Sequence, residues 1–340
     1  MKPISHRRFL VWLSSALLLV LIGGLLIGSE SMRLDWSALM AAWSAPTPSD
    51  PLMMVVMEIR LPRTLGAILV GALLGLAGAL AQGLFRNALA DPYLLGSAAG
   101  AQLGVVFALV GGAAGGTVGL AGALLQLSLV SAAFIGAWLS VLLTLFLARG
   151  AQHPIKLLLT GVVVGVVMNA ATDALIMLEP SALRGKQSFM LGSTALLGWS
   201  ACAVLALGLA VLLPLAWRWG RVLDALSLGD DTAHSLGVRL GTWRLALVSL
   251  LALATALSVA QAGLIAFVGL VAPHVVRRCA PAPAAFTLLA SSLTGAVLLS
   301  GADLLARGLL APQELPVGLV TAIIGGLYLL RLLQKNGQVV

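Results

Sequence analysis

The stretch Leu65–Leu84, LGAILVGALLGLAGALAQGL, contains no charged residue. It is long enough to cross a bilayer, which takes a helix of about 20 apolar residues. Leu245–Ala260 has the same character, and in the full chain 60% of residues are hydrophobic and 9% charged. An ordinary soluble domain is about 25% charged. Hydrocarbon admits only helices and closed barrels, and barrel strands alternate over about ten residues. These long continuous runs therefore predict an all-α polytopic membrane protein.

About ten runs of this kind are predicted to span the membrane. The expected ranges are 9–28, 62–84, 93–111, 117–147, 156–178, 194–217, 243–262, 265–279, 285–305 and 315–333. The first has the basic start of a signal peptide, but no clear cleavage site follows, so we expect it to remain as a helix. The stretch Ser181–Met190 predicts a further short helix, either at the outer surface or re-entrant. Residues 1–340 are expected to form a single transmembrane domain.

The basic residues indicate how the spans are oriented. If the N-terminus is cytoplasmic and the spans alternate, most of the 20 lysines and arginines fall on the cytoplasmic side, as the positive-inside rule requires. Both termini are therefore expected in the cytoplasm. The charges are scattered rather than gathered on one face, so no nucleic-acid partner is expected. Glycines four residues apart, such as Gly71 and Gly75, predict close packing between helices.

Few groups in the sequence could perform chemistry. There is no G-x-x-x-x-G-K-[ST] loop, so ATP hydrolysis that drives this chain would occur in another polypeptide. The two cysteines and four histidines form no metal or disulfide pattern, so this chain is expected to bind no metal or cofactor. His274 is interpreted as a packing residue. Asp173 and Asp303 are carboxylates within predicted spans, and Asp303 is expected to pair with Arg307 one turn later.

The loop between the sixth and seventh predicted spans, residues 222–238, forms a distinct pattern. Its apolar residues recur, Gly229 interrupts them, and the two aspartates that follow could begin a short helix. We therefore expect two short amphipathic helices outside the membrane. A helix lying in lipid usually carries Lys or Arg on its polar face; this loop has neither, which favours a protein partner. The expected contact residues are Leu226, Leu228, Gly229, Asp230, Asp231, Ala233, Leu236 and Gly237.

Three parts of the chain together resemble the permeases of iron-chelate and vitamin B12 ABC importers, the FecCD or BtuC-like family. The matching segments are Arg60–Leu65 with Gln82–Asn87 and Asp91–Gly96, then Leu228–Gly237, then Gly263–Arg277 with Asp303, Arg307 and Glu314–Gly318. The resemblance covers residues from about 58 to 333. Ala88 and Leu264 stand where the family often has proline, which is a departure in local detail.

The resemblance implies a BtuC-like permease fold and a homodimer around a central pathway lined by Leu157–Leu178. It implies two ATP-binding cassette subunits, which bind ATP and Mg, contacting residues 222–238 from the cytoplasm; this chain itself is then no enzyme. A periplasmic substrate-binding protein would dock on the outer side at Arg60, Arg63 and Arg307, where acidic side chains could pair with the arginines. Such a partner implies the inner membrane of a Gram-negative bacterium.

The expected cargo is an iron chelate, with heme favoured over ferric siderophores and cobalamin. The residues do not decide among these, because a neutral, glycine-rich pathway encodes no recognisable ligand pocket. The alternative is a proton-coupled secondary transporter that acts without an ATPase. In that case Asp173 would carry the proton, since ionisable residues within spans mark proton pathways.

Overall fold

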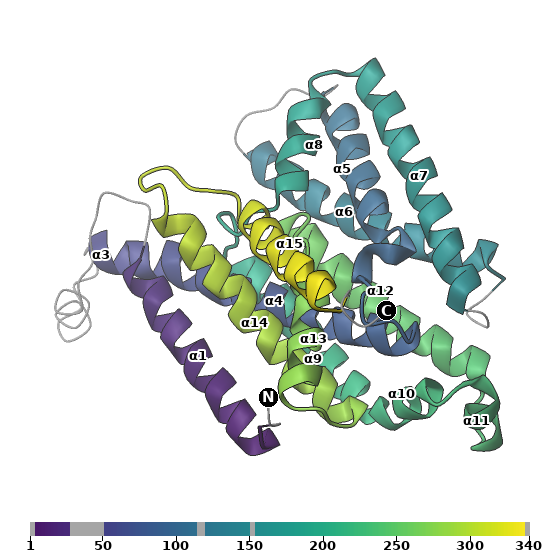
Figure 1. Ribbon diagram of the computed structural model, residues 1–340. Helices are drawn as coiled ribbons and strands as arrows, with labels where there is room; N and C mark the ends of the chain where they lie inside the picture. Colours follow the sequence, from purple (N-terminus) through teal and green to yellow (C-terminus); the bar gives the residue numbers. More distant parts are fainter. Residues whose placement is uncertain (1–3, 28–50, 114–119, 150–153, 337–340) are drawn as a thin grey trace.

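The computed structural model describes residues 4–27, 51–113, 120–149 and 154–336, and these residues are mostly helical (Figure 1). In chain order the elements are α1 (His6–Leu26), α3 (Pro51–Met54), η1 (Val55–Arg60), α4 (Leu61–Leu84), η2 (Pro92–Leu95), α5 (Ser97–Ala113), α6 (Leu120–Leu147), α7 (Pro154–Leu178), α8 (Ala182–Leu191), α9 (Trp199–Arg218), α10 (Gly220–Ser227), α11 (Asp230–Ser235), α12 (Leu240–Ala262), α13 (Val268–Cys279), α14 (Ala284–Gly308) and α15 (Val317–Asn336).

Each predicted span corresponds to one helix, and the all-α prediction is confirmed. The corresponding helices are α1, α4, α5, α6, α7, α9, α12, α13, α14 and α15. Among the described residues, seven helices are long and apolar enough to cross a membrane. Ser97–Gly111 and Val317–Leu332 are shorter apolar helices, and α13 has 12 residues. The short helix expected at Ser181–Met190 is α8.

Several predicted helix starts differ from the structure by a few residues or more, and two of these differences have an identifiable reason. The second span was expected from residue 62, but α3, η1 and α4 form one continuous helix of 34 residues, Pro51–Leu84. Glu58 and Arg60 resemble loop residues in the sequence, yet they lie in the π-helical turn η1, where Arg60 is buried. The eighth span was expected from residue 265, but Phe267 has a φ of 68°. This left-handed residue delays the helix to Val268.

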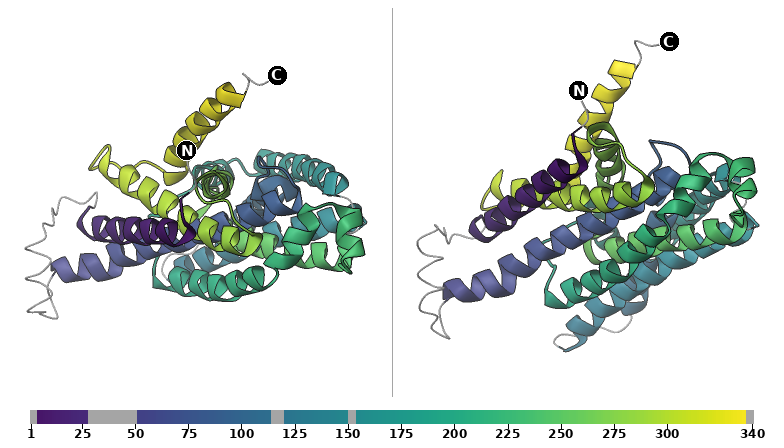
Figure 2. Two further views of the ribbon diagram at one scale, coloured as in Figure 1. Left: turned by 60° about the horizontal axis from the view of Figure 1, so that its bottom comes forward. Right: turned by 90° about the horizontal axis from the view of Figure 1, so that it is seen from below.

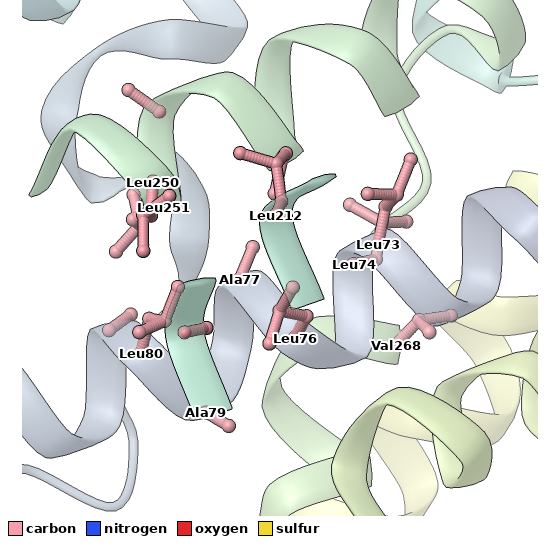
Figure 3. Close-up of a cluster of buried hydrophobic side chains, with 14 of the residues drawn as sticks. Leu73, Leu74, Leu76, Ala77, Ala79, Leu80, Leu212, Leu250, Leu251 and Val268 are labelled. Atoms are coloured by element: carbon pink, nitrogen blue, oxygen red, sulfur yellow. The ribbon is translucent and has the colours of Figure 1, made fainter. Parts of the chain in front are cut away.

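Helix α4 is the centre of the molecule. Its leucines, including Leu73, Leu76 and Leu80, are completely buried. Figure 3 shows these side chains along α4, and Leu250 and Leu251 of α12 belong to the same cluster. In the most apolar 18-residue stretch of Pro51–Leu84, 83% of the residues are buried inside the chain. A helix that is apolar on all sides is therefore enclosed by other helices rather than by lipid.

Backbone contact joins α4 to α14. A Cβ atom added to Gly71 would lie 2.3 Å from the carbonyl oxygen of Gly295, and one added to Gly75 would lie 2.1 Å from that of Ser291. Both distances are too short for a real side chain. The close packing predicted from the glycine spacing is thus confirmed.

The two faces of the bundle can be defined by contacts. At the inner face α1 begins and α4 ends, and Figure 1 places the N-terminus, α10 and α11 at this end. The Ile4 N–H donates to the Cys279 carbonyl there, at the end of α13. The outer face lies at the opposite end, where α1 ends and α14 ends. Figure 2 shows α15, in yellow, projecting away from the remaining helices.

Candidate functional site

The predicted pair of short helices in residues 222–238 is present at the inner face. α10 ends at Ser227 and α11 begins at Asp230, with Gly229 between them at a φ of 115°. The loop after α11 turns at Gly237, whose φ is 80°. Residues other than glycine rarely adopt such backbone angles, so Gly229 sets the angle at which α11 leaves α10 and Gly237 sets the turn that follows α11.

The apolar residues of this pair divide into two groups. Leu226 and Ala233 are buried against the rest of the chain, whereas Leu228 is 66% exposed and Leu236 is 62% exposed. Leu226 and Ala233, which the sequence placed on the contact surface, therefore anchor the helices to the bundle. The two exposed leucines remain candidates for contact with a protein partner. An exposed leucine is unremarkable by itself, but two of them flank α11.

An ion network fixes α11 to the bundle. One carboxylate oxygen of Asp230 accepts hydrogen bonds from Arg86, just after α4, and from Arg244, near the start of α12. The Arg244 nitrogen lies 2.5 Å from this oxygen, and the Arg244 side chain is 3% exposed. Partial burial raises the pKa of Asp230. The hydrogen bonds and positive charges of Arg244 and Arg86 together lower the pKa by more than burial raises it, so it lies below its ordinary value. Asp230 thus points toward the bundle.

Asp231 and Asp224 occupy different positions. Asp231 is exposed beside Asp230. The carboxylate of Asp224, in α10, accepts a hydrogen bond from the backbone N–H of Ala284 at 2.9 Å. Because Ala284 is the first residue of α14, this bond satisfies an N–H that the helix itself cannot pair. The helix pair is therefore attached both to α4 and to α14, which are the two most tightly packed helices.

At the outer face, Arg63 lies between two carboxylates. Its Nη1 donates to both oxygens of Glu314, at 2.8 and 2.9 Å. Its Nε and Nη2 donate to one oxygen of Asp303, at 3.3 and 3.2 Å. Thr194 donates to the same oxygen at 2.6 Å. This network joins α4, α14, the turn before α9 and the segment before α15.

The other two arginines of the outer face hold the end of α1. Arg307 pairs with Asp303 one helical turn earlier, as the sequence predicted, and also donates to the carbonyl of Gly24 at 3.2 Å. Arg60 donates to the carbonyls of Leu25 and Leu26, each at 3.0 Å. These carbonyls belong to the last turn and end of α1, where helix carbonyls lack intrahelical partners.

The three arginines expected to receive a binding protein are thus not an exposed basic surface. Arg60 and Arg307 are each 1% exposed and Arg63 is 7% exposed. Burial of a guanidinium is tolerated because carboxylates and carbonyls satisfy it. Their docking role stays a prediction. It would require Arg63 to exchange Glu314, whose side chain is 28% exposed, for a carboxylate of the partner.

The remaining candidates are isolated from both networks. Asp173, in α7, pairs with Lys186 of α8 at 2.5 Å, and the Asp173 side chain is 65% exposed. The ring of His274 contacts that of Tyr328 edge-on, with 5.8 Å between centroids, as expected of a packing residue. Among the described residues no group of three His, Cys, Asp or Glu side chains could hold a metal ion.

Sequence and structure comparisons place this geometry among transport permeases. The model of the FecCD transport family matches residues 16–335. The hemin transport system permease protein HmuU of Yersinia pestis is 36% identical, covering 94% of this chain and 95% of its own. The Fe(3+) dicitrate transport system permease protein FecD of Escherichia coli (strain K12) is 39% identical, covering 88% and 90%. The vitamin B12 import system permease protein BtuC of Escherichia coli (strain K12 / DH10B) is 36% identical, covering 98% and 97%.

Solved structures agree with this relationship. An ABC transporter assigned to the metal-chelate type, in an inward-facing conformation, has a TM-score of 0.81 at 27% identity. The likeness covers 97% of this chain and 99% of that chain. PsaBC from Streptococcus pneumoniae in complex with Fab has a TM-score of 0.58 at 17% identity, covering 80% and 89%. The second likeness concerns the fold alone.

Proposed function

Because this chain belongs to the FecCD transport family, we propose that it is the membrane-spanning permease subunit of an ATP-driven importer. The observation that supports this role most directly is the α10–α11 pair. It presents Leu228 and Leu236 outward and is tied by Asp230 to α4 and α12. A force applied to such a pair would reach the central helix of the bundle, which a loop held only at its ends could not achieve.

The partner that applies this force is an ATP-binding cassette subunit. The full sequence lacks the loop that binds ATP phosphates, so ATP and Mg are bound by the partner. Two such subunits, one for each copy of the chain, would contact α10 and α11 from the cytoplasm. The inner face is then cytoplasmic, with both termini inside, and the outer face meets a periplasmic substrate-binding protein across a bacterial inner membrane.

The proposed assembly is a homodimer. Support comes from α7, the helix expected to line the pathway. In its most apolar 18-residue stretch only 17% of the residues are buried within the chain. Its exposed valines, Val162, Val163, Val166 and Val167, would face the second copy, the pathway or lipid. Native mass spectrometry of the complex in nanodiscs should give two copies of this chain. A single copy would contradict the assembly.

The proposed cargo is an iron chelate, with hemin first. The relatives named above are permeases for hemin, Fe(3+) dicitrate and vitamin B12, so these are the three cargoes to compare. The test is growth of a strain that lacks this chain on one iron source at a time, together with a separate test of cobalamin dependence. Loss of growth on hemin alone, restored by the intact gene, is the expected result. Loss only on ferric citrate, or only without other cobalamin sources, would contradict hemin.

The proton-coupled alternative has little support in the structure. A proton carrier would lie along a path through the bundle and change its ionisation there. Asp173 is instead held in an ion pair with Lys186 of α8. The second intramembrane carboxylate, Asp303, is shared between Arg63 and Arg307, as a structural group would be.

A further inference from the structure

A cavity of about 410 Å³ opens beside α10 at the inner face. It lies between the end of α4, α10, the end of α13 and the start of α14, and its lining includes Gln82, Arg86, Asp224 and Arg277. Neither the resemblance nor the relatives assign it a role. The cavity adjoins the surface proposed for the ATP-hydrolysing partner. Its lining includes residues within 222–238 and residues outside this range.

Arg277 is held in this cavity in a fixed orientation. Its Nη1 donates to the side-chain oxygen of Gln82 at 2.9 Å. The Gln82 side-chain nitrogen in turn donates to the Leu270 carbonyl at 3.0 Å, so the amide cannot turn away. Gln82 is 2% exposed and Arg277 is half-buried. The guanidinium is therefore presented by a rigid support.

The charge of Arg277 has no carboxylate partner among the described residues. The one acidic residue in the lining, Asp224, uses its carboxylate on the Ala284 N–H. The other basic residue, Arg86, is paired with Asp230. With two arginines and one aspartate, the lining carries a net positive charge. A half-buried guanidinium whose acceptor is neutral lacks the opposite charge that would offset its burial.

We propose that this cavity receives an acidic side chain of the ATP-hydrolysing subunit, whose carboxylate pairs with Arg277. The proposal rests on the proposed function, which places that subunit against the neighbouring α10–α11 pair. A carboxylate matches a guanidinium with two parallel hydrogen bonds, and the cavity is large enough for a side chain to enter from the partner. The contact would add a second docking point, on α13, to the one on α10 and α11.

The chain offers a matched control next to the proposed residue. Arg278 carries the same charge but is exposed and does not line the cavity. The permease is purified with its co-purifying ATP-hydrolysing subunit, and the two are separated and recombined in nanodiscs of phosphatidylcholine. The dissociation constant is then measured for the wild type and for Arg277→Gln, Arg277→Lys and Arg278→Gln.

Arg277→Gln should weaken binding about tenfold or more, because it removes one member of a half-buried charge pair. Arg277→Lys should retain part of the affinity, and Arg278→Gln should stay within about twofold, as expected of an exposed charge. Higher salt should reduce the difference between wild type and Arg277→Gln only weakly, since buried pairs are poorly screened. A cysteine placed at Ala282, in the lining, should be protected from a thiol reagent when the partner is bound.

Wild-type affinity in Arg277→Gln, or an equal loss in Arg278→Gln, would overturn the proposal and leave the proposed function intact. If the effect of Arg277→Gln occurs only when phosphatidylglycerol or inorganic phosphate is added, the occupant is a phosphate group and the proposal is also wrong. If no ATP-hydrolysing subunit binds the wild-type chain at all, the proposed function fails together with the inference.

Discussion

Asp230 accepts hydrogen bonds from Arg86 and Arg244 through one oxygen, whereas the neighbouring Asp231 is exposed. Comparing Asp230→Asn with Asp231→Asn therefore separates an aspartate that holds α11 to the bundle from one that is exposed, a difference that the sequence did not show. Asp230→Asn should loosen α11, because Arg244 is left buried without its carboxylate. With a discount for the partial exposure of Asp230, the cost is about 1 kcal/mol.

Hydrogen exchange of the α11 amides measures this loosening. Exchange should be about fivefold faster in Asp230→Asn, whereas Asp231→Asn should match the wild type. Equal protection in both variants would mean that the ion network does not hold α11.

The same residue gives a pH dependence with a defined sign. The pKa of Asp230 is lowered in the folded protein, so its contribution is present above the ordinary pKa of an aspartate, about 4. It is lost only as the pH falls through the lower, folded value. Protection of α11 should therefore be constant from neutral pH down to about pH 5, and the wild type should approach Asp230→Asn only at lower pH. A decline of α11 protection between pH 8 and pH 6 would contradict this account.

Replacing Asp303 should lower the free energy of unfolding by more than replacing Glu314. Asp303→Asn leaves Arg63 and Arg307 buried with reduced compensation, and breaking a buried pair costs about 3–5 kcal/mol. Glu314→Gln removes a partly exposed partner of Arg63, and the expected cost is at most about 1 kcal/mol. Thermal unfolding in one detergent compares the two. A larger loss in Glu314→Gln than in Asp303→Asn would show that the order of importance is wrong.

The residue contacts that were predictable from sequence are the local ones. Asp303 and Arg307 are four residues apart on one helix, so their pairing followed from helical geometry. Arg86 and Asp230 are separated by 144 positions, and Arg63 and Glu314 by 251. Nothing in the sequence pairs Arg86 or Arg244 with Asp230. Such partners become visible only when the packing of the helices is known.

At the scale of helices, the close contact between α4 and α14 requires a residue without a side chain at position 75. Gly75→Ala would place a Cβ 2.1 Å from the Ser291 carbonyl, and the helices would have to separate, at a cost of about 1–3 kcal/mol. Gly301→Ala on α14 is a matched control, because a Cβ at Gly301 meets no atom within 4 Å. It should be neutral or stabilise by up to about 1 kcal/mol.

Thermal unfolding of both alanine variants, in the same detergent, distinguishes tight packing from a general effect of changing glycine. The account predicts a lower unfolding temperature for Gly75→Ala and an unchanged or higher one for Gly301→Ala. Equal changes in the two variants would contradict close backbone contact between α4 and α14.

The presence of each helix was predictable, because a helix that crosses lipid or the core needs a long run of apolar residues. The ends of the helices were less predictable, because they depend on individual residues and on partners that are distant in the sequence. Arg60 lies inside a helix because the end of α1 supplies carbonyls for its guanidinium. Similarly, the sequence does not show that Asp303, Glu314 and the end of α1 lie around the three outer arginines and bury them.

For the whole molecule, α4 connects the two ion networks. Its inner end leads to Arg86 and the α10–α11 pair, and its outer end carries Arg63 and its carboxylates. Along its length α4 is also in close backbone contact with α14, at Gly71 and Gly75. In the importer proposed above, α4 is therefore the helix that would carry a movement of α11 to the outer face.

The measurement that tests the central claim most directly is uptake into proteoliposomes that contain this chain and its co-purified ATPase. Hemin, ferric citrate and cobalamin are supplied in turn, with the substrate-binding protein on the outer face, and ATP or a pH gradient is varied independently. The account predicts that uptake of one cargo requires internal ATP, does not respond to the pH gradient and survives Asp173→Asn. Uptake that proceeds without ATP, follows the pH gradient and is lost in Asp173→Asn would contradict it.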